Sequence, residues 1–160
     1  MTDNSVNYSD VLEVAALKVP GSGGKSYSDI IRDTDKVIEK NRMRFVRYLA
    51  DDIKEVQKMF RVYMQYSTPE NLRPIFDRIH NLRGQGTLFD YPLVTTIGGH
   101  FCRYIDNLPD DVSPRREVVQ TFINSLQVVQ AEQIKGEGSE NLQVLTETMG
   151  RMVDALIEQE

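Results

Sequence analysis

Residues 68–89 have the sequence TPENLRPIFDRIHNLRGQGTLF, which begins with the signals of a helix N-terminus. Thr68 supplies an N-cap hydroxyl, Pro69 suits the first helical position, and Glu70 places an acid in the first turn. Apolar residues then recur at helical spacing along one face, namely Leu72, Ile75, Phe76, Ile79 and Leu82. We therefore predict an amphipathic helix that buries this face.

The segments on either side of this stretch also have helical periodicity. Residues ~34–66 contain no Gly or Pro and predict one long helix with the apolar stripe Phe45, Leu49, Ile53, Val56, Phe60 and Tyr63. A helix from about Tyr91 to Leu108, which Pro109 ends, has the stripe Leu93, Ile97, Phe101, Ile105 and Leu108. Ser113-Pro114 predicts the start of a fourth helix, with the inward residues Val119, Phe122, Leu126 and Val129. Ser139 predicts the start of a fifth, with the stripe Leu142, Leu145, Met149, Met152 and Leu156.

These patterns predict an all-α fold, because no segment has a convincing strand pattern. Short connections between long helices favour antiparallel neighbours, so we expect an up-and-down antiparallel four-helix bundle over residues 30–160, with an additional C-terminal helix. Residues 1–29 form an additional N-terminal segment that is weakly patterned and includes a glycine-rich linker at residues 20–26. An apolar cluster before this linker predicts either a short helix packed on the bundle or a docking segment: Val11, Leu12, Val14, Ala15, Ala16 and Leu17.

The composition narrows the class of protein. Apolar residues make up 40% of the chain and charged residues 27%, which is typical of a globular domain. The net charge of -5 argues against a nucleic-acid partner, because neutralising phosphates needs a basic face. No apolar run reaches the ~20 residues that cross a bilayer, and the N-terminus lacks the features of a signal peptide. Cys102 is the single cysteine, so we expect no internal disulfide and a cytoplasmic location.

His80 lies in the predicted helix of residues 68–89 and is the most informative residue of the chain. At about 100° per residue, His80 lies about 100° from Ile79, the centre of the buried face, so the ring should be exposed on the flank. Gly84, four residues on, lies beside it on the outward side, and Arg83 lies on the inward side with its guanidinium able to reach out. Gly86 should face the core and permit close helix packing.

This arrangement has a chemical logic. A neutral imidazole is a competent nucleophile near pH 7 and can form a covalent intermediate. A phosphoryl group on His80 would carry about -1.5 to -2 charges, and the Arg83 guanidinium offers charge-assisted hydrogen bonds to its oxygens. Glycine in a helix interior costs about 1 kcal/mol relative to alanine, so Gly84 needs another explanation. We interpret it as leaving the ring nitrogen open to another protein.

The stretch from His80 to Phe89 resembles the signature of histidine-containing phosphotransfer domains: a histidine, then Lys or Arg at +3, Gly at +4 and a small residue at +6. It is also similar to the phosphorylated N-terminal domain of chemotaxis histidine kinases, in Gly86 and in the aromatic Phe89. The resemblance spans roughly residues 40–134 and implies a four-helix bundle with the histidine exposed midway along one helix. It implies that His80 is phosphorylated, with Arg83 and Gly84 assisting and Gln85, Gly86 and Thr87 in supporting positions.

The function that the resemblance implies is a phosphoryl shuttle between response-regulator receiver aspartates in a two-component phosphorelay. The partners would be receiver domains, with a hybrid histidine kinase as a further candidate. We expect no cofactor and no metal in this chain, because magnesium in such systems belongs to the receiver. Nothing in the 160 residues resembles an ATP-binding kinase domain, so the chain would carry a phosphoryl group without a kinase activity of its own.

The sequence departs from the family pattern at three positions. Asp90 stands where many members have Gly, and Gln85 where the residue is usually small. Cys102 stands near a glutamine that in some members contacts the phosphorylatable ring, and a thiol is a much weaker hydrogen-bonding group. Which residue orients the His80 ring is therefore open at this point.

Other interpretations of the same residues are structural. The bundle could be a non-phosphorylated adaptor that binds receivers or partner helices and uses His80 only as a contact. His100 and Cys102 point about 160° apart around a helix, so they are poorly placed to share a metal ion. The pair Gly98-Gly99 predicts a close helix crossing, because no strand precedes it. Five methionines at helical spacing are most simply core residues: Met43, Met59, Met64, Met149 and Met152.

Overall fold

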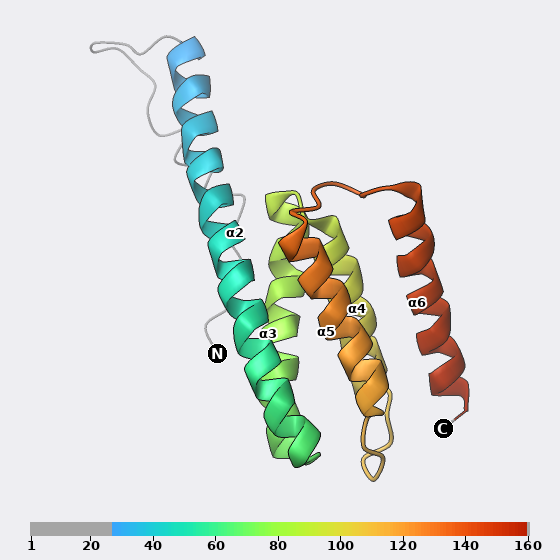
Figure 1. The fold of residues 1–160 in the computed structure, drawn as a ribbon. Helices are drawn as coiled ribbons and strands as arrows, with labels where there is room; N and C mark the ends of the chain where they lie inside the picture. Colours follow the sequence, from blue (N-terminus) through green and yellow to red (C-terminus); the bar gives the residue numbers. More distant parts are fainter. Residues whose placement is uncertain (1–26, 160) are drawn as a thin grey trace. The chain divides into compact units, whose positions relative to one another are not determined.

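The computed structural model describes residues 27–159, and this part of the chain is helical with no strand. Its five α-helices are α2 (Tyr27–Gln65), α3 (Pro69–Gly86), α4 (Pro92–Asp106), α5 (Arg116–Ala131) and α6 (Glu140–Glu158). A single 3-10 turn, η1 (Thr87–Phe89), follows α3. The all-helical prediction is thus confirmed, while the predictions for residues 1–26 lie outside the described residues (Figure 1).

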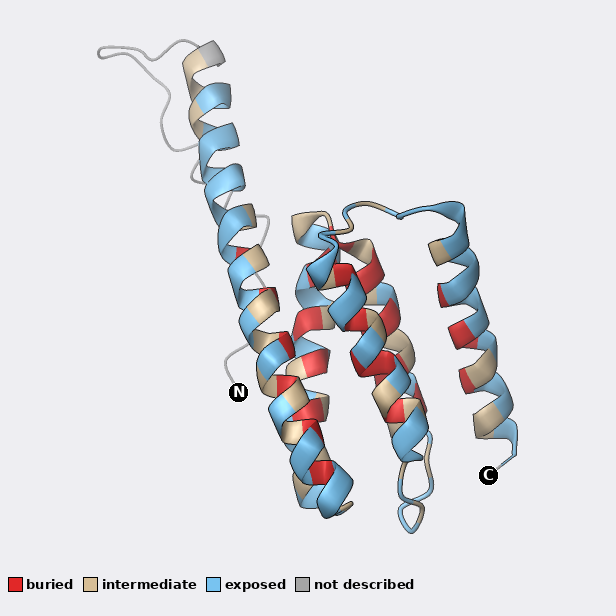
Figure 2. Cartoon of the chain, in the orientation of Figure 1, coloured by how far each residue is buried: buried red, intermediate tan, exposed pale blue. Residues whose placement is uncertain are grey.

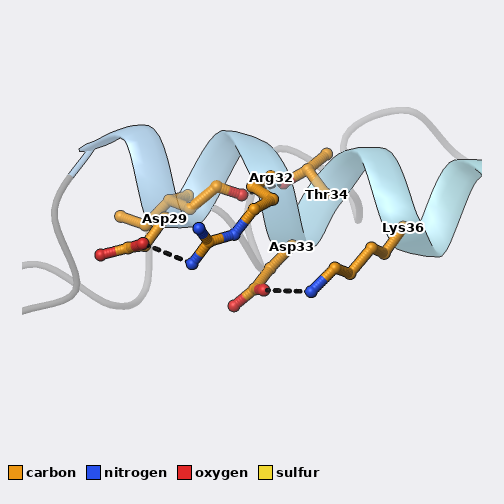
Figure 3. A network of polar contacts seen from close by, with 6 residues as sticks. Asp29, Arg32, Asp33, Thr34 and Lys36 are labelled. Carbon is orange, nitrogen blue, oxygen red and sulfur yellow. Dashed lines mark hydrogen bonds and ion pairs between the residues drawn. The ribbon is translucent and has the colours of Figure 1, made fainter.

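The chain divides into two compact units, one ending at Glu39 and one beginning at Lys40. In the first unit, local ion pairs line the start of α2: Arg32 pairs with Asp29 at 2.6 Å, and Lys36 with Asp33 at 4.0 Å (Figure 3). Such pairs three residues apart add about 0.2–0.5 kcal/mol each to helix stability. They support a stretch of helix whose apolar residues, such as Val37, are largely exposed.

In the second unit, α2 to α5 form an up-and-down bundle, and contacts between helix ends establish the directions. Near the start of α2 in this unit, Phe45 stacks on Phe89, just after α3, with ring centroids 4.7 Å apart. At the other end of α2, the Tyr63 hydroxyl donates to the Pro114 carbonyl just before α5. Helix α4 packs against both α3 and α5. Each helix therefore runs antiparallel to its neighbours in the bundle.

The core of this unit is formed by the predicted apolar stripes. The six predicted α2 residues are each at most 4% exposed, and the four predicted α5 residues at most 2%. Figure 2 shows these buried positions on the sides of the helices that face one another. Two methionines predicted in the core are instead exposed, Met43 at 55% and Met64 at 41%, because each lies off the buried stripe of α2.

Helix boundaries differ from the prediction at α4 and α5. Helix α4 ends at Asp106, two residues before Leu108. Helix α5 begins at Arg116 and not at Ser113-Pro114, because two buried tyrosines hold the preceding backbone extended. The Arg115 amide donates to the Tyr104 hydroxyl at 3.0 Å, and Tyr63 binds the Pro114 carbonyl. Backbone groups bonded in this way do not need helical partners.

Helix α6 packs on α4, and the His100 ring of α4 lies against Gly150 of α6 at this contact. A Cβ atom on Gly150 would lie 2.9 Å from Cε1 of His100, so the imidazole occupies the place of a side chain. Arg103 pairs with Asp154 at 2.7 Å and donates to the Gly150 carbonyl at 3.1 Å. The inward face of α6 is consequently Thr146, Met149, Gly150 and Val153. Leu145, predicted to face inward, is 48% exposed.

The stability of the chain should depend on pH through His100. Burial, with the Arg103 charge adding to it and Asp154 opposing it, lowers the pKa of His100 from its ordinary value of 6.5. His100 therefore binds its proton at a higher pH in the unfolded chain than in the folded protein. Its contribution to stability is fully present above pH 6.5 and is lost as the pH falls from there toward the pKa of the folded state. Urea titrations at several pH values give the free energy of unfolding as a function of pH. We expect His100 to contribute a slope of at most about 1.4 kcal/mol per pH unit to this dependence. His100→Gln should remove that component, and an unchanged slope would contradict it.

None of the helices over residues 27–159 combines the length and apolar character needed to span a membrane.

Candidate functional site

His80 lies on the exposed side of α3, as its helical position predicts. Two residues of the same helix contact its ring. The Arg83 guanidinium lies three residues on, with Nη2 3.0 Å from His80 Nε2. Phe76 lies four residues before, with its ring centroid 6.0 Å from that of His80 and the planes 25° apart. The imidazole is therefore held from both sides along the helix axis.

The contact with Arg83 fixes the tautomer of the His80 ring in this arrangement. A guanidinium has only donors, so the bond between Arg83 and Nε2 requires that Nε2 accept. Nε2 then holds the lone pair, and in the neutral ring the proton resides on Nδ1. The nitrogen nearest Arg83 is thus the nucleophilic one.

Phe76 connects the ring to the core of the bundle. It is half-buried, and its ring lies 6.4 Å from that of the fully buried Phe101 on α4. The Arg73 guanidinium covers it from another side, 5.6 Å from the ring centroid. A ring anchored in this way offers His80 a firm stacking surface. Phe76 was predicted as a core residue, and its contact with the histidine was not foreseen.

Gly84 is exposed on the surface of α3, one turn after His80. A Cβ atom built on Gly84 would have nothing within 4 Å, so no part of the fold requires a glycine there. Because glycine costs about 1 kcal/mol in a helix relative to alanine, the residue lowers helix stability without a packing reason.

Gly86 has the opposite environment and is structural. A Cβ atom there would lie 2.6 Å from the Tyr91 carbonyl oxygen and 2.9 Å from the Thr95 amide nitrogen. Its own carbonyl accepts from the Tyr91 amide at 2.8 Å. The small residue at this position lets the chain turn tightly from α3 into α4, which confirms that Gly86 faces the core.

Two other predicted site residues, Gln85 and Thr87, differ in their surroundings. Gln85 is exposed on the surface near Gly84. Thr87 is committed to the fold, since its amide and hydroxyl both donate to the Thr95 hydroxyl, at 2.9 and 3.1 Å. Asp90 adopts a left-handed conformation with φ 69°, which glycine adopts without strain and Asp tolerates better than most residues.

Cys102 takes no visible part in orienting the ring. Its side chain is fully buried in the core, and burial raises the pKa of the thiol to about 11, so the group stays protonated at neutral pH. Phe76 and Arg83 occupy the two sides of the imidazole along the helix. Cys102 is thus a packing residue of the core.

Thr95 is the residue of this region that sequence reasoning missed. Its hydroxyl donates to the Arg83 carbonyl at 2.9 Å while accepting from Thr87. Nothing in the sequence pairs residue 95 with residue 83, because they lie on different helices and the register between them is set by packing. Within residues 27–159, no three side chains of the metal-ligating types come together.

The comparisons with known proteins give no match: no family model, no curated protein and no solved structure matches the chain.

Proposed function

We propose that the protein is a histidine phosphotransfer protein that relays a phosphoryl group between receiver aspartates through His80. One observation carries the proposal. An exposed imidazole presents Nε2 beside the Arg83 guanidinium, and Gly84 leaves the approach open. A nucleophile, a fixed cation and a cleared surface are what transfer of an anionic group between two proteins requires.

The transfer step follows from this geometry. His80 Nε2 attacks the phosphorus of an aspartyl phosphate on the partner, and an N–P bond forms as the P–O bond to the carboxylate breaks. The leaving carboxylate keeps the electron pair, and the positive charge placed on the ring is lost with the Nδ1 proton to solvent. As the phosphoryl group approaches, Arg83 moves its hydrogen bond from Nε2 to the phosphoryl oxygens, which frees the Nε2 lone pair for attack and gives a stronger contact between two charged groups. Return transfer to a second receiver reverses the step.

Replacing Arg83 tests the role of its cation. Arg83→Gln should slow phosphoryl transfer about 10- to 100-fold, because a hydrogen bond to a charged group contributes about 1.5–3 kcal/mol. Arg83→Lys should retain part of the rate, since it keeps the charge and loses the planar fork. The matched control is Arg78→Gln, which removes the same charge from the same helix, where Arg78 pairs with Asp52 of α2 at 2.5 Å. Rapid-mix assays measure each rate, and equal losses in both glutamine variants would refute a specific role of Arg83.

The proposal is tested against the adaptor function by chemical trapping. The chain is incubated with a small phosphodonor or with a phosphorylated receiver, and the product is examined for acid-labile phosphate. A phosphotransfer protein becomes labelled on histidine. An adaptor binds the receiver with the same affinity whether or not His80 is present and never becomes labelled.

A further inference from the structure

One turn of α4 lies close to Arg83. The Thr95 hydroxyl donates to the Arg83 carbonyl at 2.9 Å. A Cβ atom on Gly98 would lie 3.0 Å from the Arg83 Cβ, and one on Gly99 would lie 3.8 Å from the Arg83 Cδ. Because these α4 residues are three and four apart, they lie on one face. That face therefore bounds both the backbone and the side-chain stem of Arg83.

The Thr95 hydroxyl uses its full hydrogen-bonding capacity in this contact. It donates to the Arg83 carbonyl and accepts from the Thr87 amide and hydroxyl, which matches one donor and two lone pairs. The Arg83 carbonyl and the Thr87 amide are the two groups that an ideal α-helix would join to each other. Thr95 thus binds α4 to the last turn of α3, where Arg83 resides.

Gly98 lets α4 come close to the base of the Arg83 side chain. A Cβ atom at residue 98 would lie 3.0 Å from the Arg83 Cβ, so a larger residue there would push on the stem whose guanidinium ends 3.0 Å from His80 Nε2. Close packing at the base of a side chain restricts its rotamers, so less conformational entropy is lost when it binds a phosphoryl group. The residue that contacts the His80 ring is thus itself packed against α4.

From these contacts we infer that Thr95 is a positioning residue for phosphotransfer: its hydroxyl holds the Arg83 backbone against α4, so that Arg83 fixes the His80 ring. The inference rests on the proposed function for its kinetic part. Its structural part concerns the ring of the unphosphorylated protein and stands separately.

The experiment compares Thr95→Val, which removes the hydroxyl at nearly constant volume, with Thr95→Ser, which keeps it. In ¹⁵N spectra of labelled histidine, the wild-type His80 ring should have its proton on Nδ1 and an accepting Nε2. Thr95→Val should shift the ring toward the tautomer mixture of free imidazole, as Arg83→Gln does, and Thr95→Ser should restore the wild-type spectrum. Thr96→Val, at the exposed next position of α4, is the matched control and should leave the spectrum unchanged.

The kinetic arm measures phosphoryl transfer in the same variants. Thr95→Val should lose about three- to tenfold in rate, the loss of one neutral hydrogen bond, and Thr95→Ser should recover it. If Thr95→Val unfolds, Thr95→Ala removes the hydroxyl without bulk and takes its place. An unchanged ring spectrum in the hydroxyl-free variant overturns the inference, and an altered spectrum with an unchanged rate overturns the kinetic role of Thr95. A wild-type chain that accepts no phosphoryl group overturns the proposed function and the kinetic role together, while the spectra still decide whether Thr95 orients the ring.

Discussion

His80→Gln should abolish phosphoryl labelling of the chain, both by a small phosphodonor and by phosphorylated receivers. The N–P bond can form only at a ring nitrogen, and the glutamine amide keeps polarity and approximate size without a nucleophilic lone pair on nitrogen. The loss should exceed about a hundredfold, since no neighbouring group can replace the nucleophile. His80 is exposed, and exposed substitutions usually change stability by less than about 0.5 kcal/mol, so folding should be preserved.

The sequence provides its own control for this result, because it contains two histidines. His100 is half-buried between α4 and α6, with its ring against Gly150. His100→Gln should therefore remain labelled at the wild-type rate, whatever it does to stability. Labelling that persists in His80→Gln and disappears in His100→Gln would show that His100 on α4 is the phosphorylated residue, which would refute the proposal.

Substituting alanine at the two glycines after His80 should have opposite effects. Gly86→Ala should destabilise the fold by about 1–3 kcal/mol, because its Cβ would meet the Tyr91 carbonyl at 2.6 Å and backbone cannot move aside cheaply. Gly84→Ala should stabilise it by up to about 1 kcal/mol, since the Cβ meets nothing and alanine favours the helix. Urea denaturation of the two variants beside the wild type measures both changes.

A larger side chain at Gly84 separates access from stability. Gly84→Gln should slow transfer from a phosphorylated receiver by about tenfold or more, equivalent to about 1.4 kcal/mol, because the side chain would stand where the partner approaches. Labelling by a small phosphodonor should change little, since that molecule needs less room. If both donors were slowed equally, the effect would lie in the His80 ring itself, and the access role of Gly84 would be wrong.

Much of the fold could be predicted because the buried stripes dominate the sequence pattern. The stripe of α2 from Phe45 to Tyr63 is confirmed residue by residue, since burial of large apolar side chains outweighs other preferences over that length. The prediction failed where a particular tertiary contact decided the outcome. Leu145 faces solvent because the face of α6 that packs on α4 is the one with Gly150, against which the His100 ring lies. Helix α5 begins two residues after Pro114 because two tyrosine hydroxyls bind the backbone before it.

The contacts of the candidate site that lie within one helix could likewise be predicted, and those between helices could not. The contacts of His80 with Arg83 and Phe76 lie within one helix, at +3 and -4, so helical geometry places these side chains within reach of one another. The open surface at Gly84 and the buried position of Gly86 follow from the same angles. Thr95 could not be found in this way, because its bond to the Arg83 carbonyl joins two helices. Its pairing depends on how close α4 approaches α3, which the absence of a Cβ atom at Gly98 allows.

The most direct test of the central claim is a transfer profile of the wild-type chain against the full receiver set encoded in its genome. Each receiver is phosphorylated with a radioactive label and mixed briefly with the chain, and the labelled chain is then mixed with each unlabelled receiver. The account predicts that at least one receiver passes its label to the chain within seconds to minutes, as acid-labile phosphate on His80, and that a receiver then takes it up. If every phosphorylated receiver kept its label in the presence of the chain, His80 would not be a phosphoryl carrier.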